Sequence, residues 1–446
     1  MVSRIRKLIV AAVVLAASSP LVAQAPASLR LSFAEAVRQV AANTPPPAVE
    51  IAGFRAEAAA ARVRQARSGL LPDLDLSGSW VNRSFNSKTL GFSFPGPISI
   101  PTRIGPFSAW DGRARVTQTI FDFSTLGRVR AAKGQVVAAN AERSAAVENS
   151  AQTVALGYAR ATRAQAVVVA RQADSVLAAE LVGLAVAQER AGVSASIDVT
   201  RAKTQLADAA GRLVVAENQL DRARIDLARA LGIDPATPIV LTDTLSAQLG
   251  AADVPADRNT AVTLAVAARP DVAAEAARGS AARRSASAIA AERLPRLELE
   301  ADYGLSGQRP PDMITTRQVA VQVTLPILDG FRREGRLAEQ QAAVQESDVR
   351  VRDLRQQVAA DVDGALLDLR SAAAQQTIAA DRLQLAAQEV SEARQRFKAG
   401  VVGNIEVINA QSSLLRARDA DIDARFAAVS ARIALARSVG SARTLH

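Results

Sequence analysis

Two stretches of this chain, 128–190 and 336–398, contain no proline, and each is long enough for one uninterrupted helix. Apolar residues in the second stretch recur at every seventh position, the spacing of a coiled-coil seam. They are Leu337, Val344, Val351 and Val358, with Leu354 between them. About 63 residues at 1.5 Å each give a helix of ~95 Å, far longer than a compact domain needs. We therefore predict long antiparallel coiled-coil helices that pack side by side.

A short motif at the end of each long stretch occurs twice. AGVSASIDVTRA begins at Ala191, and AGVVGNIEVINA begins at Ala399, 208 residues later. The likeness extends outward in the same order on both sides, which a chance motif would not do. The further matching pairs are 66–80 with 291–304, 116–124 with 323–331, and 223–232 with 431–440.

These matches predict two internal structural repeats, 26–232 and 260–446, joined by a linker at 233–259 in the equatorial region of the bundle. The linker is rich in Pro, Asp and Gly, a composition typical of connecting segments. Each repeat is predicted to contain a helix, two strands, a very long helix, a tip turn and a returning helix. The predicted tips are 190–196 and 398–404.

Four segments alternate apolar and polar residues with a period of two, which predicts strands with one apolar and one polar side. The expected strand pairs are about 73–83 with 108–122 and about 295–305 with 317–329. The apolar side carries the aromatic residues that suit a membrane interface, namely Trp80, Trp110 and Tyr303. The polar side carries Arg113, Glu298 and Glu300.

The alternation alone fits two kinds of fold. A soluble sandwich would bury the apolar side, whereas a membrane barrel would turn it to lipid and turn the charges to a water-filled lumen. Two separated strand pairs are too few for a sandwich, so the barrel is favoured. Four strands cannot close a barrel, because open edges in lipid leave backbone groups unpaired. A dimer would supply eight strands and a trimer twelve, and a conducting pore favours the trimer.

The N-terminal segment 1–25 is predicted to be a secretory signal peptide. Arg4, Arg6 and Lys7 precede the apolar run LIVAAVVLAA, and the small-residue stretch AQAPA follows it, which is the pattern of an export signal. No other stretch approaches the roughly 18 apolar residues of a membrane-spanning helix. We therefore expect an exported chain without a helical anchor.

Composition argues against catalysis. The sequence has no Cys, and its single His is His446, so thiol chemistry and nearly every transition-metal site are excluded. No Gly-rich phosphate loop or Ser/His/Asp set occurs, and we predict no catalytic residues, metal or cofactor. The formal net charge is +10, but basic and acidic residues are interleaved, which argues against a nucleic-acid partner.

The doubled strand segments, the FD of TIFDFS and the LD of ILDGF leading into long helices, and the paired AGVxxxIDV and AGVxxxIEV turns resemble the TolC-type outer membrane efflux proteins. The likeness covers essentially the whole mature chain. It implies an α+β membrane protein: a homotrimer with a 12-stranded β-barrel in the outer membrane and a helical tunnel in the periplasm. It also implies passive transport with a periplasmic adaptor (membrane fusion protein) and an inner membrane pump, in tripartite efflux or type I secretion. The alternative is a soluble periplasmic coiled-coil scaffold or adaptor.

The tip turns explain the repeated motif. Gly192 and Gly400 stand where a helix must end and reverse, and glycine suits the left-handed geometry of that position. Ser196 and Asn404 are expected to cap the returning helices. Acidic residues follow in the first turn, where they complement the helix dipole.

The resemblance assigns roles to residues near the tips. It implies adaptor docking at Gly192, Val193, Ser194, Gly400, Val401 and Val402. It also implies a periplasmic gate: Glu406 matches the first of two acidic residues that ring the closed aperture, but Asn409 stands where the second is expected. Asp198 matches an acid that holds the aperture shut, and Arg201 is expected to pair with a nearby acid.

Overall fold

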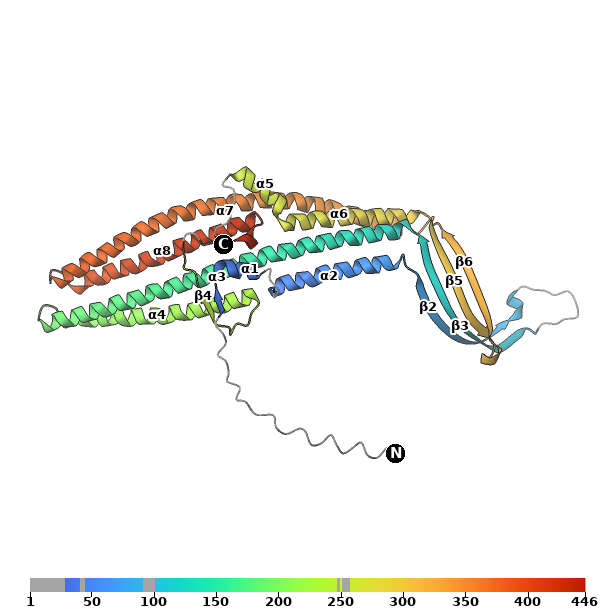
Figure 1. The fold of residues 1–446 in the computed structure, drawn as a ribbon, viewed down its shortest axis with the longest axis horizontal. Helices are drawn as coiled ribbons and strands as arrows, with labels where there is room; N and C mark the ends of the chain where they lie inside the picture. The colour runs from blue at the N-terminus through green and yellow to red at the C-terminus, as the bar shows by residue number, and fades with distance from the viewer. Residues whose placement is uncertain (1–28, 41–44, 91–100, 247–248, 251–256, 446) are drawn as a thin grey trace, which may run out of the picture.

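The computed structural model describes residues 29–40, 45–90, 101–246, 249–250 and 257–445. It is an elongated bundle of helices with one curved sheet at its end (Figure 1). The expected signal peptide, 1–25, lies outside the described residues. Within them, none of the helices has the length and apolar character to cross a membrane.

Two very long helices form the spine of the bundle. They are α3 (Phe123–Arg190) with 68 residues and α7 (Arg332–Lys398) with 67 residues. Each reverses at a tip into a shorter helix, α4 (Ser196–Leu231) and α8 (Asn404–Ser438), and packs along it. The heptad seam of α7 turns toward its neighbours: Val358 is fully buried and Leu354 is half-buried. The long-helix prediction is therefore confirmed.

The two halves of the chain contain the same order of elements around these helices. In the first half, α2 (Pro47–Ser68) leads into β2 (Asp73–Asn86), β3 (Arg103–Phe121), α3 and α4. In the second half, α6 (Pro270–Ala290) leads into β5 (Arg296–Gly307), β6 (Ile314–Thr324), α7 and α8. Both α2 and α6 pack on α3. All four helix–strand connections therefore lie at one end of the sheet, and the hairpin loops lie at the other (Figure 1).

The sheet joins one hairpin from each half in the order β2-β3-β5-β6, antiparallel throughout. Its strands differ from the expected bounds by up to five residues, and the largest differences are at two ends. β3 begins at Arg103, before the expected 108. β6 ends at Thr324, short of the expected 329, because Pro326 has no N–H to donate to a neighbouring strand.

The segment between the halves includes secondary structure. It contains β4 (Ile239–Leu241), which pairs in parallel with β1 (Leu29–Leu31), and the start of α5 (Arg258–Ala268). The expected linker at 233–259 thus also ties the first described residues to the middle of the bundle.

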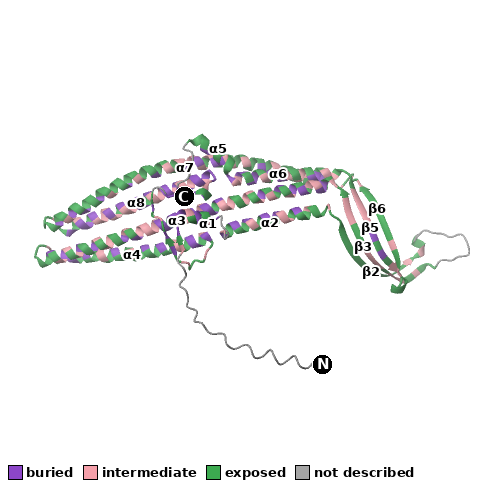
Figure 2. Cartoon of the chain, viewed as in Figure 1, coloured by how far each residue is buried: buried purple, intermediate pink, exposed green. Residues whose placement is uncertain are grey.

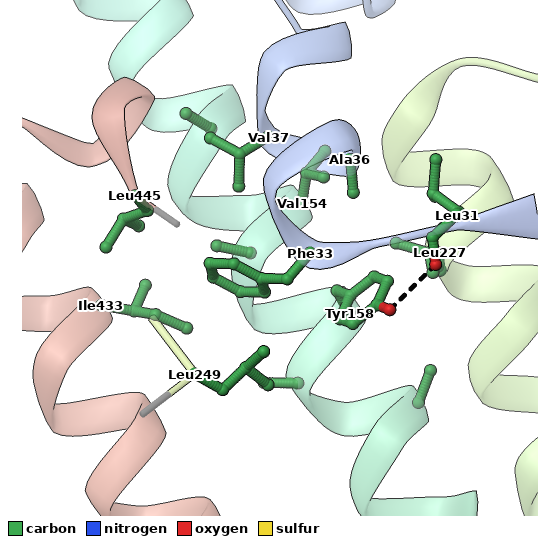
Figure 3. Close-up of a cluster of buried hydrophobic side chains, with 14 of the residues drawn as sticks. Leu31, Phe33, Ala36, Val37, Val154, Tyr158, Leu227, Leu249, Ile433 and Leu445 are labelled. Carbon is green, nitrogen blue, oxygen red and sulfur yellow. Dashed lines mark hydrogen bonds between the residues drawn. The ribbon is translucent and has the colours of Figure 1, made fainter. Parts of the chain in front are cut away.

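The largest apolar cluster lies at this middle level, where α1 (Phe33–Gln39), α3 and α8 meet. Phe33 packs edge-on against Tyr158 with ring centroids 5.7 Å apart. The Tyr158 hydroxyl donates to the Leu31 carbonyl at 2.9 Å (Figure 3). Burial raises the pKa of Tyr158. The largest buried apolar cluster of the described residues thus lies at the middle of the bundle and contains the rings of Phe33 and Tyr158.

Candidate functional site

The sheet has two chemically different faces. Leu74, Leu76, Tyr303, Val319 and Val321 are exposed on one face, and the strands are mostly exposed or half-buried in the single chain (Figure 2). Trp80 and Trp110 lie opposite each other in the register, with ring centroids 6.1 Å apart. Tyr303 lies on the next strand, opposite Ala114. The expected apolar face, with its three aromatic residues, is therefore present on one continuous surface.

The opposite face carries paired charges. The Arg113 guanidinium donates to Asp111 Oδ1 at 2.8 Å and to Asp302 Oδ1 at 2.7 Å. Arg115 lies 3.1 Å from Glu300. Side chains of β3 and of the neighbouring strand β5 therefore form a charged network on this face. Such a face needs water, which agrees with a lumen on this side.

Both sheet edges are open within the described chain. β2 pairs only with β3, and β6 pairs only with β5. The strands alternate in direction, so the two edge strands run in opposite directions. The β6 edge of one copy is therefore suited to antiparallel pairing with the β2 edge of another, whereas an unpaired edge would expose backbone N–H and C=O groups.

The far end of the bundle is formed by the two tip turns. Gly192 and Gly400 both adopt φ +72°, which is a left-handed conformation that a side chain would strain. The backbone N–H of Val193 donates to Gln188, and that of Val401 donates to Arg396, at 3.0 and 3.1 Å. These six-residue closures are the Schellman geometry. The glycine prediction for both turns is confirmed.

The capping prediction for the returning helices is wrong. Ser196 and Asn404 are the first helical residues, and the caps are Ala195 and Gly403, neither of which supplies a side-chain bond. Asn404 is instead completely buried and donates from Nδ2 to the Asp198 carbonyl at 2.6 Å. It joins the two tips.

A second side-chain amide also joins the two tips, this time from the first tip to the second. Gln188 Nε2 donates to the Phe397 carbonyl at 2.6 Å, and the Phe397 ring is buried in the cluster below both tips. Sequence reasoning missed both amides because their partners lie more than 200 residues away in the chain. The two tips thus behave as one packed unit.

The predicted acids occupy different environments. Asp198 accepts a hydrogen bond from the Ser194 hydroxyl at 2.7 Å, and Arg201 lies 3.6 Å away, as expected. Glu406 accepts from Arg396 at 2.6 Å, a partner that was not predicted. Asn409 is exposed, and its side chain makes no hydrogen bond with any described residue. Among the described residues, no group of three or more His, Cys, Asp or Glu could hold a metal ion.

Comparison with known proteins decides the family. Residues 39–233 and 261–441 match the family model described as outer membrane efflux protein. This chain belongs to the outer membrane efflux protein family. The two matched ranges cover both halves and leave out most of the segment between them.

Relatives of this efflux protein agree with that assignment. Protein CyaE of Bordetella pertussis is 29% identical over 380 residues, covering 83% of this chain and 76% of CyaE. The CmeC outer membrane channel of Campylobacter jejuni has a similar fold with TM-score 0.77, at 16% identity over 92% of this chain and 86% of CmeC. The open-state MtrE outer membrane channel of Neisseria gonorrhoeae gives TM-score 0.74, at 18% identity over 92% and 89% of the two chains.

Family membership indicates which end of this efflux protein lies in the membrane and which lies in the periplasm. Outer membrane efflux proteins are outer membrane channels that extend into the periplasm, and they are not enzymes. The sheet is the membrane end, and the tips are the periplasmic end. A soluble scaffold, the alternative considered from the sequence, does not agree with this membership.

Proposed function

We propose that three copies of this chain form one outer membrane channel-tunnel, which receives substrates from a periplasmic adaptor and an inner membrane pump and conducts them passively to the exterior. The observation that carries the proposal is the sheet: four strands, two open edges of opposite direction, an apolar face and an ion-paired polar face. Energy for transport comes from the pump, since the channel performs no chemistry.

The strand count supports three copies. Backbone groups at an open edge cannot be satisfied in hydrocarbon, so the sheet must close on itself through other copies. Two copies would give eight strands, and side chains fill a barrel of that size. Three copies would give twelve, with the network around Arg113 turned to the lumen and Val319 turned to lipid.

The tips are suited to receiving an adaptor. Val193 and Val401 are 63% and 69% exposed and occupy equivalent positions of the two turns. Together with Gly192, Ser194, Gly400 and Val402 they form a small apolar surface on a rigid base. Such a surface fits the apolar end of a helical hairpin from a partner protein.

The same end supplies a gate. Three copies of Glu406 would place three carboxylates near the periplasmic aperture, each next to an Arg396 guanidinium that offsets part of its charge. The neutral Asn409 gives this channel one acidic ring where two are expected for the family. Asp198, with Arg201 beside it, occupies the matching position on the outer tip.

Two measurements test the proposal. Purified protein run on a gel without heating should migrate as an oligomer that heat converts to the monomer, and chemical cross-linking should stop at three copies. In planar bilayers the unheated oligomer should give discrete conductance steps. A monomer that stays out of bilayers would overturn the proposal, and a closed dimer without conductance would overturn the trimeric pore.

A further inference from the structure

The helix–strand connections form a distinct surface at the periplasmic end of the sheet. The segment after β6, Leu325–Phe331, is its most apolar part. Ile327 is 87% exposed and Phe331 is 74% exposed, and Leu325 and Leu328 are exposed as well. In the first half of the chain, α3 begins two residues after β3, so no comparable segment is left there.

This segment continues the apolar face of the sheet. On β6 the apolar face is formed by Val319, Val321 and Val323, and the same alternation reaches Leu325 and Ile327. Pro326 ends the strand, and Gly330 and Phe331 then turn the chain into α7 with φ values of +68° and +62°. A bulky residue with positive φ is strained, yet the Phe331 ring is held out in solvent in the single chain. The conformation keeps an apolar surface outside the packed bundle.

Arginines whose side chains make no ion pair or hydrogen bond within the described chain lie near the same helix–strand connections. Arg332 follows Phe331 directly, is exposed, and makes no ion pair or hydrogen bond through its side chain with any described residue. Three more exposed arginines of this kind lie near the other connections of the first half: Arg64, Arg67 and Arg130. By contrast, Arg293 and Arg336 are paired with Glu334 and Glu292, at 2.9 Å each. The four free arginines outnumber the exposed acids near these connections that form no ion pair in the part of the chain that the structure describes, which are Asp73 at the start of β2 and Glu339 near the start of α7, so this level carries unmatched positive charge.

We propose that Leu325–Phe331 and Arg332 form a binding site for an anionic phospholipid of the periplasmic leaflet, and that Arg64, Arg67 and Arg130 extend it around the channel. The acyl chains lie against Ile327 and Phe331. The phosphate oxygens accept hydrogen bonds from the Arg332 guanidinium, whose planar N–H groups suit a bidentate contact with phosphate. Continuity with the lipid-facing sheet and unmatched positive charge at the headgroup level both favour a lipid over a protein.

The proposal rests on the sheet lying in the membrane, and its first test separates the two claims. The chain has no Cys, so a single introduced cysteine can carry a spin label without background. The labelled variants are Val319→Cys on the sheet, Ile327→Cys in the proposed site and Val401→Cys at the tip. Each purified oligomer is reconstituted in phosphatidylcholine vesicles containing phosphatidylglycerol, and collisions with oxygen and with a water-soluble nickel chelate are compared.

The site predicts that the labels at Val319 and Ile327 collide with oxygen and are shielded from nickel, whereas the label at Val401 collides with nickel. A Val319 label accessible to nickel would overturn the membrane barrel itself. A lipid-exposed Val319 with an Ile327 label shielded from both reagents would mean that a neighbouring copy covers the segment. That result, like nickel access at Ile327, would overturn the lipid site alone.

The second test measures lipid selectivity. Spin-labelled phosphatidylglycerol and phosphatidylcholine are compared by the fraction whose motion the protein restricts. Phosphatidylglycerol should be preferred, by roughly fivefold for a site with one engaged arginine. The preference should fall in Arg332→Gln and disappear when Arg64, Arg67, Arg130 and Arg332 are all replaced by Gln. Arg309→Gln is the matched control, because Arg309 is an exposed arginine in the β5–β6 hairpin loop, at the end of the sheet opposite the helix–strand connections. This substitution should leave the lipid preference unchanged. Equal restriction of both lipids, or equal effects of Arg332→Gln and Arg309→Gln, would overturn the proposal.

Discussion

Equivalent residues in the two halves have acquired different partners. Asp198 and Glu406 are 208 positions apart and both lie in the first turn of a returning helix, but Asp198 is held by Ser194 of its own turn, whereas Glu406 is held by Arg396 of the preceding helix. Glu406 is also the more accessible of the two acids: its side chain is 36% exposed, against 13% for Asp198, although each has an arginine partner. This difference makes Glu406 the better candidate for a charge that faces permeating ions.

Replacement of Glu406 should alter conduction without affecting assembly. Glu406→Gln removes the carboxylate and leaves Arg396 unpaired at the aperture, so cation selectivity and block by divalent cations should both decrease. Single-channel recording in planar bilayers measures both quantities. Asp198→Asn is the comparison, with a smaller expected effect. Unchanged block in Glu406→Gln would leave the carboxylate only its favourable interaction with the helix dipole, about 0.3–1 kcal/mol.

A buried carboxylate in α3 holds the C-terminal turn. Glu148 is 2% exposed, its Oε2 accepts the Ala442 N–H at 2.8 Å, and Arg443 lies 3.2 Å from Oε1. Burial raises the pKa of Glu148 above its ordinary value of 4.5, although Arg443 and the Ala442 N–H oppose that shift. The folded protein therefore holds this proton more tightly than the unfolded chain does.

That shift predicts a pH-dependent stability. As the pH falls from the raised folded pKa toward 4.5, the penalty for burying the charged form is relieved, so the Glu148 contribution to the free energy of unfolding increases. Glu148→Gln keeps an acceptor for Ala442 and cannot titrate. The melting temperature of the wild type relative to Glu148→Gln should therefore rise through this window. Parallel melting curves at every pH would contradict the prediction. Glu148→Leu should lose about 1–3 kcal/mol, because the Ala442 N–H is left unpaired.

At the scale of elements, close helix packing depends on missing side chains. A Cβ added at Gly127 of α3 would lie 2.7 Å from the Ala288 Cβ of α6, whereas one added at Gly183 of the same helix would meet nothing within 4 Å. Gly127→Ala should thus separate α3 from α6 and cost about 1–3 kcal/mol through overpacking. Gly183→Ala should add about 0.5–1 kcal/mol through helix propensity. Thermal melting of the two variants compares them directly, and similar shifts would rule out a close α3–α6 contact.

The elements themselves could be predicted from local patterns, but their contacts could not. Proline-free heptads and period-two alternation predicted α7 and the sheet, because each pattern is fixed by neighbours a few residues away. The Asn404 and Gln188 bonds depend on residues of the other half, so the capping role assigned to Asn404 was wrong. The early end of β6 at Thr324 had a local signal in Pro326, which the alternation obscured. Charge alone likewise could not pair Glu406 with Arg396.

At the scale of the whole molecule, the membrane end and the tips are separated by the full length of α3 and α7, so assembly and docking can be disturbed independently. Closure of the barrel depends on the sheet edges. The tips take no part in that closure, and their proposed contribution is the small apolar docking surface around Val193 and Val401. A change confined to that surface should therefore leave the oligomer intact.

Val401→Asp tests this separation. The charge would face an apolar partner surface without a counter-ion, so export should be lost while the heat-sensitive oligomer and its conductance in planar bilayers persist. Val401→Ile keeps the surface apolar and should retain export. Gly400→Arg should also abolish export. Because residue 400 has a φ of +72°, which strains any side chain, a loss of export in this variant supports docking only if Val401→Asp loses export as well. Normal export by Val401→Asp would remove the docking role of the tips, and loss of the oligomer would show instead that they take part in assembly.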